Sequence, residues 1–163
     1  MKSVAVDLDA VLGDTRPLWR SWLEDAARRF RAIAELDPAA LPEDRGEAAR
    51  ELDRWAERGI GDWRAALERF AEDHAPLHLR PRPQANEALL RLKAAGARLG
   101  AFTDAPEPLA RVALAHLGAA RRLDATEAGA GALESLLERL GPGAVVVRSL
   151  DELSQAAGLA GPP

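Results

Sequence analysis

Short apolar segments that alternate with helical patterns constrain the fold of this chain most strongly. Residues 3–6, 97–102 and 144–147 are apolar runs of strand length, and residues 121–126 form a weaker one. Helical patterns bounded by Gly, Pro or capping residues follow these runs, at about residues 84–95, 105–117, 131–140 and 150–157. Strands that alternate with helices over short loops predict an α/β fold, a Rossmann-like parallel sheet with helices on both faces.

A long helical segment interrupts this alternation between the first two strands. Residues 15–75 contain all four tryptophans and three helical patterns, at about 15–35, 43–58 and 62–73. A connector with three prolines follows. We expect the tryptophans to form the core of the helical segment, because large aromatic side chains at helical spacing usually pack inward. The segment is interpreted as an insertion that stands over the sheet.

Charge and composition exclude several classes of protein. The 163 residues carry a net charge of -4 and include no cysteine. Interspersed charges argue against partners such as nucleic acid or a membrane surface, and the lack of cysteine excludes thiol catalysis, disulfides and thiolate metal sites. No apolar run approaches the ~18 residues of a membrane-spanning helix. The first apolar run is too short for a signal peptide, so a cytoplasmic location is expected.

Two carboxylates follow the first apolar run. Asp7 and Asp9 in VAVDLDAVLGDT lie two residues apart at the carboxyl end of that strand, where open parallel sheets bind ligands. Side chains two apart on a strand share a face, so we expect the carboxylates to lie close together. Such a pair suits a Mg²⁺ site or the combination of a nucleophile with a general acid. The alternative is a turn with two solvated acids.

Together with its surroundings, this motif resembles the haloacid dehalogenase (HAD) superfamily of phosphohydrolases. DLDAVLGDT is similar to the first motif of that family, approximately DxDGTxxDT, with Ala10 in place of the glycine. The apolar run LGAFTD, which includes Thr103, is similar to the second motif. The resemblance implies a HAD-like core formed by residues 1–14 and 78–163, with residues 15–77 as an inserted helical cap.

The resemblance also implies a role for each matched residue. Asp7 would be the nucleophile that forms an aspartyl-phosphate. Asp9 would be the general acid and base, and its backbone carbonyl would bind Mg²⁺. Thr103 would donate a hydrogen bond to the transferring phosphoryl group. The implied activity is that of a phosphatase that hydrolyses a small phosphorylated metabolite with Mg²⁺ as cofactor.

The third motif of the family, a Lys or Arg before a helix, has no counterpart at the expected place. This region reads TEAGAGALESLL and contains no basic residue. Arg111, Arg121 or Arg122 could supply the charge from a neighbouring position, since a guanidinium binds phosphate bidentately. The alternative is that all three are surface charges.

The fourth motif of the family, an acid or acid pair such as GDxxxD after the last strand, is altered as well. Arg148 and Ser149 occupy the place of the usual GD, and Asp151 or Glu152 could still reach a metal. Alternatively, Ser149 and Glu152 form a capping box, and Asp151 lies in the first helical turn, where the helix dipole favours an acid. The candidate metal ligands are Asp7, Asp9 and Asp151.

Arg148 and Asp104 join Thr103 as candidates for binding the substrate phosphate. Arg148 would face the carboxylate pair from its strand end, where it would either hold the carboxylates or bind phosphate; the alternative is that it turns to solvent. Asp104 lies where the family often has Asn or Asp. It also forms a capping box with Glu107, and we expect this capping role for it.

Two functions stay open on these grounds. The first is a HAD-like phosphatase, which the set of Asp7, Asp9 and Thr103 indicates. The second is a catalytically impaired HAD-like protein that binds a phosphorylated ligand or a protein partner, which the altered third and fourth motifs indicate.

Overall fold

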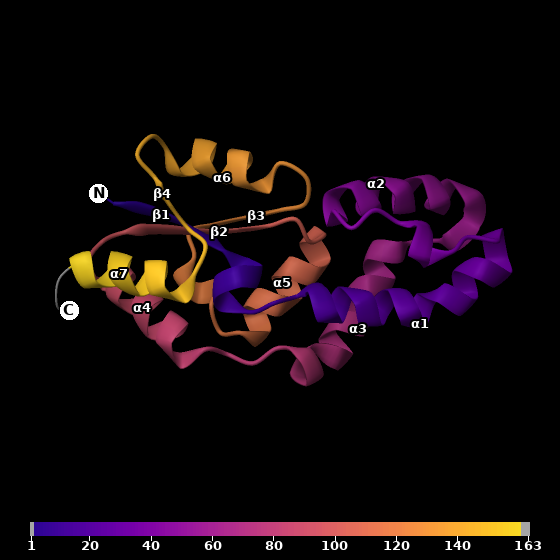
Figure 1. The fold of residues 1–163 in the computed structure, drawn as a ribbon, viewed down its shortest axis with the longest axis horizontal. Coiled ribbons are helices and arrows are strands. Elements are labelled where there is room, and N and C mark those ends of the chain that lie inside the picture. Colours follow the sequence, from indigo (N-terminus) through magenta and orange to yellow (C-terminus); the bar gives the residue numbers. More distant parts are fainter. Residues whose placement is uncertain (1, 161–163) are drawn as a thin grey trace.

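The computed structural model describes residues 2–160 and contains a four-stranded parallel sheet (Figure 1). The strands are β1 (Ser3–Asp7), β2 (Arg98–Thr103), β3 (Ala125–Ala128) and β4 (Val145–Val147), in the order β3-β2-β1-β4. Val4 of β1 pairs with Leu99 on one side and with Val145 on the other. All strands therefore end at the same edge of the sheet. The predicted α/β fold with a Rossmann-like parallel sheet is confirmed.

Helices cover both faces of this sheet, as the alternation of strands and helices predicts (Figure 1). They are α4 (Pro83–Ala94), α5 (Glu107–His116), α6 (Ala132–Leu140) and α7 (Leu150–Leu159), with a short 3₁₀ turn η4 (Ala120–Arg122). Helix α6 packs alone on one face, where Gly100 of β2 leaves the space that Leu136 fills. Helices α4, α5 and α7 cover the opposite face together with the main apolar core.

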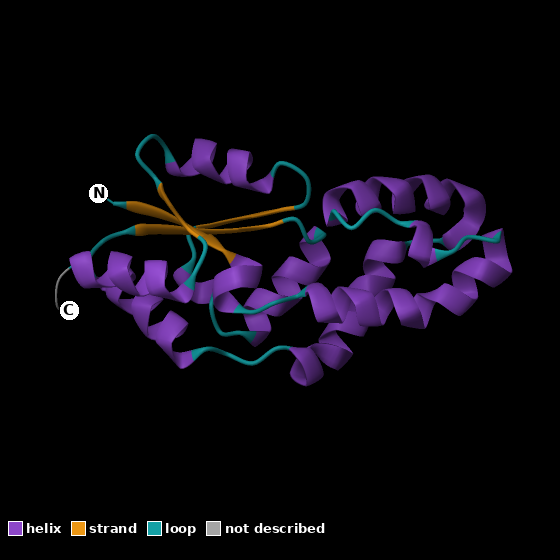
Figure 2. Cartoon of the chain, viewed as in Figure 1, coloured by secondary structure: helices purple, strands orange, loops and turns teal. Residues whose placement is uncertain are grey.

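The segment between β1 and α4 contains helices and loops but no strand, as expected. It comprises η1 (Leu8–Leu12), α1 (Arg16–Ala34), η2 (Pro38–Ala40), α2 (Arg45–Trp55), η3 (Ala56–Ile60) and α3 (Trp63–His78). Figure 2 shows the strands gathered at one end of the elongated molecule and this helical segment at the other. The segment therefore extends beyond the carboxyl edge of the sheet, where a ligand of an α/β protein would bind.

The tryptophans form the interior of the helical segment. Trp22 and Trp63 are almost fully buried, and their ring centroids lie 6.1 Å apart. Phe30 contacts both Trp22 and Trp55 edge to face. Burial of one such side chain stabilises a fold by about 1.5–3 kcal/mol. These residues belong to the same apolar cluster as Val4 and Val6 of β1, so the helical segment and one face of the sheet share a continuous core. The boundaries predicted for a separate cap remain a prediction.

Two element boundaries differ from those expected. Helix α3 continues through Pro76 to His78, because the carbonyl of Ala75 still accepts a bond from the amide of Leu79 and closes the last turn. The weak strand expected at 121–126 is divided into η4 and β3, which begins only at Ala125. Within residues 2–160, no helix combines the length and the apolar character that crossing a membrane requires.

Candidate active site

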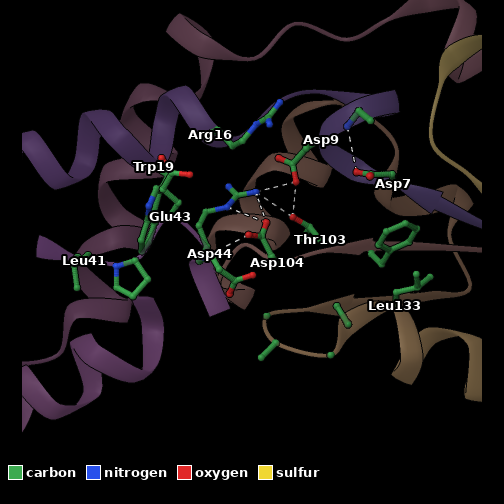
Figure 3. Close-up of a pocket in the computed structure, with 18 of the residues that line it drawn as sticks. Asp7, Asp9, Arg16, Trp19, Leu41, Glu43, Asp44, Thr103, Asp104 and Leu133 are labelled. Carbon is green, nitrogen blue, oxygen red and sulfur yellow. Dashed lines mark hydrogen bonds and ion pairs between the residues drawn. The ribbon is translucent and has the colours of Figure 1, made fainter. Parts of the chain in front are cut away.

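A cavity of about 850 Å³ opens at the carboxyl edge of the sheet, between the strand ends and the helical segment (Figure 3). The sheet side contributes Asp7, Asp9, Thr103, Asp104 and Arg148. The helical segment contributes Arg16, Trp19, Arg20, Asp44 and Arg45. The structure thus brings together every predicted site residue except Asp151. A volume of this size accommodates a small organic ligand.

Asp7 is the last residue of β1, and its side chain caps η1. Its Oδ1 accepts a hydrogen bond of 3.2 Å from the amide of Ala10, and its Oδ2 lies 3.8 Å from Nη1 of Arg148. Within the described chain Oδ2 accepts no hydrogen bond, so it stays available to a ligand. Burial raises the pKa of Asp7 above its ordinary value, and the negative charge of Asp9 adds to this, although Ala10 and Arg148 oppose it.

Asp9 lies in the first turn of η1, one element beyond the strand on which it was expected. Its Oδ1 accepts hydrogen bonds from the amide (2.9 Å) and the hydroxyl (2.5 Å) of Thr15. Its Oδ2 accepts bonds from the hydroxyl of Thr103 (2.6 Å) and from Nη2 of Arg45 (2.9 Å). Burial would raise the pKa of Asp9, but the charge of Arg45 and the hydrogen bonds from Thr103 and Thr15 outweigh it and lower the pKa.

Arg45 lies at the centre of the site and was not predicted from the sequence. It begins α2, its side chain is 2% exposed, and its guanidinium reaches the strand ends. Nη1 donates to the hydroxyl of Thr15 (2.6 Å), and Nη2 donates to Asp9 (2.9 Å) and to Asp104 (2.8 Å). One buried cation therefore joins α2 to the turn that follows β1 and to the residue that follows β2.

The sequence does contain a signal for Arg45. The buried residues Ala48, Leu52 and Trp55 follow it at helical spacing, so Arg45 lies on the inward face of α2. A charged residue on such a face must find a partner, because an unpaired buried charge is strongly unfavourable. Its partners are the acids Asp9 and Asp104, which follow the first two strands.

Asp104 has a different role from the expected cap. Helix α5 begins after Pro106, and no side chain caps its amino end. The carboxylate of Asp104 instead accepts hydrogen bonds from the backbone amide, Nε and Nη2 of Arg45. The capping assignment is wrong because the guanidinium, with five fixed donors, binds the carboxylate in its place.

Comparison with protein-family models identifies the family of this chain. The model of the haloacid dehalogenase-like hydrolase family matches residues 1–147, most of the chain. The chain belongs to the haloacid dehalogenase-like (HAD) hydrolase family. The expected resemblance is confirmed, and hydrolases of this family generally use Mg²⁺. No curated protein matches the sequence at a significant level.

Solved structures show the same fold at low sequence identity. CbbY from Rhodobacter sphaeroides in complex with phosphate is 20% identical, with a TM-score of 0.63 over 97% of this chain and 83% of that chain. A variant of that protein in complex with xylulose-(1,5)bisphosphate is 18% identical, with a TM-score of 0.62 over 94% and 83% of the two chains. A HAD phosphatase from Thermococcus onnurineus is 18% identical, with a TM-score of 0.54 over 97% and 98%. At these identities the likeness shows the fold alone.

The loop that lacks the basic residue of the third HAD motif packs directly against α2. Gly129, Ala130 and Gly131 line the cavity, and Gly129 and Gly131 both have positive φ angles. A Cβ on Gly46 of α2 would lie 2.9 Å from the backbone of Ala130. Small residues on both sides therefore allow the close approach that carries the neighbouring Arg45 into the site.

The three arginines considered for the third motif lie elsewhere. Arg111 forms ion pairs with Glu68 and Glu107 on the surface, and Arg122 donates to the carbonyl of Gly118. Neither of them, nor Arg121, lines the cavity. They are surface charges, and the buried cation comes from the helical segment.

The segment after β4 forms the capping box that the sequence analysis gave as an alternative. The amide of Glu152 donates to Oγ of Ser149 (3.1 Å), and the amide of Arg148 donates to Oε2 of Glu152 (2.6 Å). Asp151 lies exposed in the first turn of α7, where the helix dipole favours an acid. The structure therefore does not bring Asp151 together with Asp7 and Asp9 as a third metal ligand.

The donor set does not fit the Mg²⁺ site expected for the family. Among residues 2–160, no three acidic or histidine side chains are grouped to hold a metal ion. Asp9 could offer only its backbone carbonyl, because both of its carboxylate oxygens already accept hydrogen bonds, so Asp7 is the available carboxylate between the strand ends. Asp151, the expected third ligand, does not line the cavity, whereas the cation Arg148 does.

Replacing Gly46 by alanine tests the close approach of α2 to the loop. The extra methyl group would meet the backbone of Ala130, and such overpacking costs about 1–3 kcal/mol, more than the gain of about 1 kcal/mol in helix propensity. We expect a lower free energy of unfolding in urea. Gly158→Ala in α7, where a Cβ meets nothing within 4 Å, is the matched control and should not destabilise the protein. Equal stabilisation of both variants would show that the contact is absent.

Proposed function

We propose that this HAD hydrolase is a phosphatase that acts on a small phosphorylated metabolite through an aspartyl-phosphate on Asp7. One observation carries the proposal: Asp7 presents an oxygen without a hydrogen-bond partner in residues 2–160 to the cavity. Thr103 and Asp9 lie beside it, joined by a hydrogen bond of 2.6 Å. A carboxylate nucleophile next to a second carboxylate and a hydroxyl donor suits phosphoryl transfer, in which positioning and charge neutralisation supply most of the rate.

In the proposed reaction, Oδ2 of Asp7 attacks the phosphorus, and the bond between phosphorus and the ester oxygen breaks. The leaving oxygen takes a proton from Asp9, or leaves unprotonated where it belongs to an acidic phenol. Water then attacks the phosphorus of the acyl phosphate, loses a proton to Asp9, and releases inorganic phosphate and the Asp7 carboxylate. Because the donor set does not fit Mg²⁺, no step of the proposed reaction uses a metal ion.

In this proposal the remaining candidate residues neutralise the charge of the phosphate and hold it in position. Thr103 donates to the transferring phosphoryl group once its bond to Asp9 opens, and Arg148 binds the phosphate as a cation. Asp104, also a candidate for phosphate binding, acts through Arg45, because its own carboxylate would repel a phosphate dianion. The proposed division into a core of residues 1–14 and 78–163 and a cap of residues 15–77 places the substrate between the two.

The class of substrate is proposed from the ligands of the similar structures and from the cavity. CbbY binds phosphate and xylulose bisphosphate. The cavity of this chain adds Arg16 and Arg20 on its helical side. Glu43 and Asp44 line the same side, but arginines on both sides of the cavity still suit a small anionic metabolite better than a neutral one.

One observation favours the alternative, a HAD-like protein that binds a phosphorylated ligand or a protein partner without efficient turnover. A general acid must carry a proton, yet Asp9 is held ionised by Arg45, Thr15 and Thr103. Proton donation by Asp9 requires Arg45 to move away from it. An arrangement that kept Arg45 in place would bind ligands and release no product from esters with poor leaving groups.

Hydrolysis of two phosphate esters separates these functions. An aryl phosphate with an acidic phenol needs no proton from Asp9 to release its leaving group, whereas an alkyl phosphate does. We expect phosphate release from the aryl ester above the background set by the Asp7→Asn variant, and slower release from the alkyl ester. Binding of both esters without release of phosphate would support the alternative function and contradict the phosphatase proposal.

A further inference from the structure

The residue after β4 is the feature that the proposed reaction leaves unexplained. In the family an acid stands close to this position and serves the metal ion, whereas this chain has Arg148, which lines the cavity. Its Nη1 lies 3.8 Å from Oδ2 of Asp7, and its guanidinium lies 5.4 Å from the centre of the Phe102 ring. A positive side chain thus stands beside the proposed nucleophile.

The guanidinium of Arg148 lies over the Phe102 ring with its donors free. The contact with Asp7 is too long for a hydrogen bond, and stacking on an aromatic ring uses none of the N–H groups. Within the described residues, no side-chain atom of Arg148 donates a hydrogen bond, and the side chain is 57% exposed. A guanidinium with five donors, positioned by a ring and open to the cavity, is suited to bidentate binding of a phosphate.

The other charges of the cavity leave this task to Arg148. Arg45 is buried and already balances two carboxylates, those of Asp9 and Asp104. Arg16 pairs with Asp14, and Arg20, four residues further along α1, also comes from the helical side. A phosphate dianion beside Asp7 would therefore meet a surplus of negative charge at the strand ends, and Arg148 is the cation that lies next to it.

The acids that follow Arg148 lie in the first turn of α7 and do not line the cavity. Glu152 accepts the backbone amide of Arg148, and its own amide is capped by Ser149. Asp151 is exposed in the first turn of α7. The loop after β4 thus directs a guanidinium, and no carboxylate, into the cavity.

We propose that Arg148 supplies the positive charge that a metal ion provides in other HAD hydrolases, so that phosphate binds beside Asp7 without a divalent cation. The inference rests on the proposed function, because it assigns the charge partner of the same phosphate site. Arg148 and the hydroxyl of Thr103 then form an oxyanion site beside Asp7, built from side chains alone.

Calorimetric titration with inorganic phosphate tests this directly. Wild-type protein should bind phosphate in EDTA, and addition of millimolar Mg²⁺ should change the Kd by less than about threefold. Arg148→Ala should weaken phosphate binding by about 10- to 100-fold, since it removes charge-assisted hydrogen bonds. Arg121→Ala, which removes the same charge outside the cavity, should leave the Kd unchanged.

A double variant restores the order of charges usual in the family. Arg148→Gly together with Ser149→Asp places an acid after β4, and aspartate keeps the cap of α7 because it is an equally good N-cap residue. This variant should lose phosphate binding in EDTA and regain it with Mg²⁺. Failure to regain it would contradict the idea that Arg148 stands in the place of the metal.

The outcomes separate the inference from the function on which it rests. Phosphate binding by the wild type only in the presence of Mg²⁺, or unchanged binding by Arg148→Ala, would overturn the inference and leave the phosphatase proposal intact. Absence of phosphate binding under both conditions would overturn the inference, and absence of aryl phosphate hydrolysis as well would overturn the phosphatase proposal. Aryl phosphate hydrolysis in EDTA at the rate measured with Mg²⁺ would support both.

Discussion

Replacing Asp7 by asparagine is expected to lower kcat for aryl phosphate hydrolysis by at least about 1,000-fold, because an amide cannot form the aspartyl-phosphate intermediate. The carboxylate faces the cavity with an oxygen that accepts no hydrogen bond from residues 2–160, and no second carboxylate of the strand ends is free to replace it. Steady-state release of phosphate measures the effect. Asp25→Asn, an exposed position on α1, is the matched control and should retain full activity.

The stability of the same variant shows whether the loss is chemical or structural. The pKa of Asp7 is raised in the folded protein, chiefly by burial, so its ionisation disfavours folding at any pH above its ordinary value of 3.8. Removal of this charge should leave the free energy of unfolding at neutral pH unchanged or slightly higher. Retention of wild-type activity by Asp7→Asn would contradict the assignment of the nucleophile; loss of activity with unfolding would contradict the account of its pKa.

Replacing Arg45 by alanine is expected to lower the free energy of unfolding by about 3 kcal/mol. This value is at the lower end of the range observed when one partner of a buried ion pair is removed. The change would leave Asp9, which is 11% exposed, as a charge without its cation, and would free Asp104. The value lies at the lower end because Asp104 is 42% exposed and can be solvated. Urea denaturation measures it, and Arg50→Ala, exposed on the same helix, should change stability little.

The pH dependence of Arg45→Ala follows from the pKa of Asp9. In the wild type this pKa is lowered, so the stability that it contributes is present above the ordinary value of 3.8 and is lost as the pH falls through the folded-state pKa. Without Arg45, the largest influence that opposes burial is lost, so the pKa of Asp9 should be higher than in the wild type. The difference between the two proteins should therefore be largest at neutral pH and shrink below about pH 4. A difference that is constant from neutral to acidic pH would mean that Arg45 stabilises the fold by packing alone.

The geometry of the strand ends could be predicted from the sequence, because it follows from the sheet. Parallel strands that begin with apolar runs must end at one edge, and this placed Asp7, Thr103 and Arg148 around one cavity. The capping box of Ser149 and Glu152 was also readable, since its bonds are local. Local sequence patterns and the order of strands were therefore enough to predict most of the fold and the residues on the sheet side of the site.

The helical side of the site could not be predicted in the same way. The direction in which α2 faces the sheet depends on long-range packing, such as the contact of Gly46 with Ala130, which no spacing reveals. Asp104 shows the same limit: its sequence pattern indicates a helix cap, but a guanidinium from 59 residues away binds it instead. The inward-facing Arg45 was the one signal available, and its partners depend on the fold.

Identification of the phosphorylated residue is the most direct measurement of the central claim, that Asp7 is the phosphoryl acceptor. The wild-type protein would be mixed with an aryl phosphate, quenched in acid within the first turnover, digested and analysed by mass spectrometry. We predict one added phosphoryl group on the peptide that contains Asp7, and none on the Asp7→Asn variant under the same conditions. Release of phosphate with no label on that peptide, or the same label on the Asp7→Asn variant, would contradict the account.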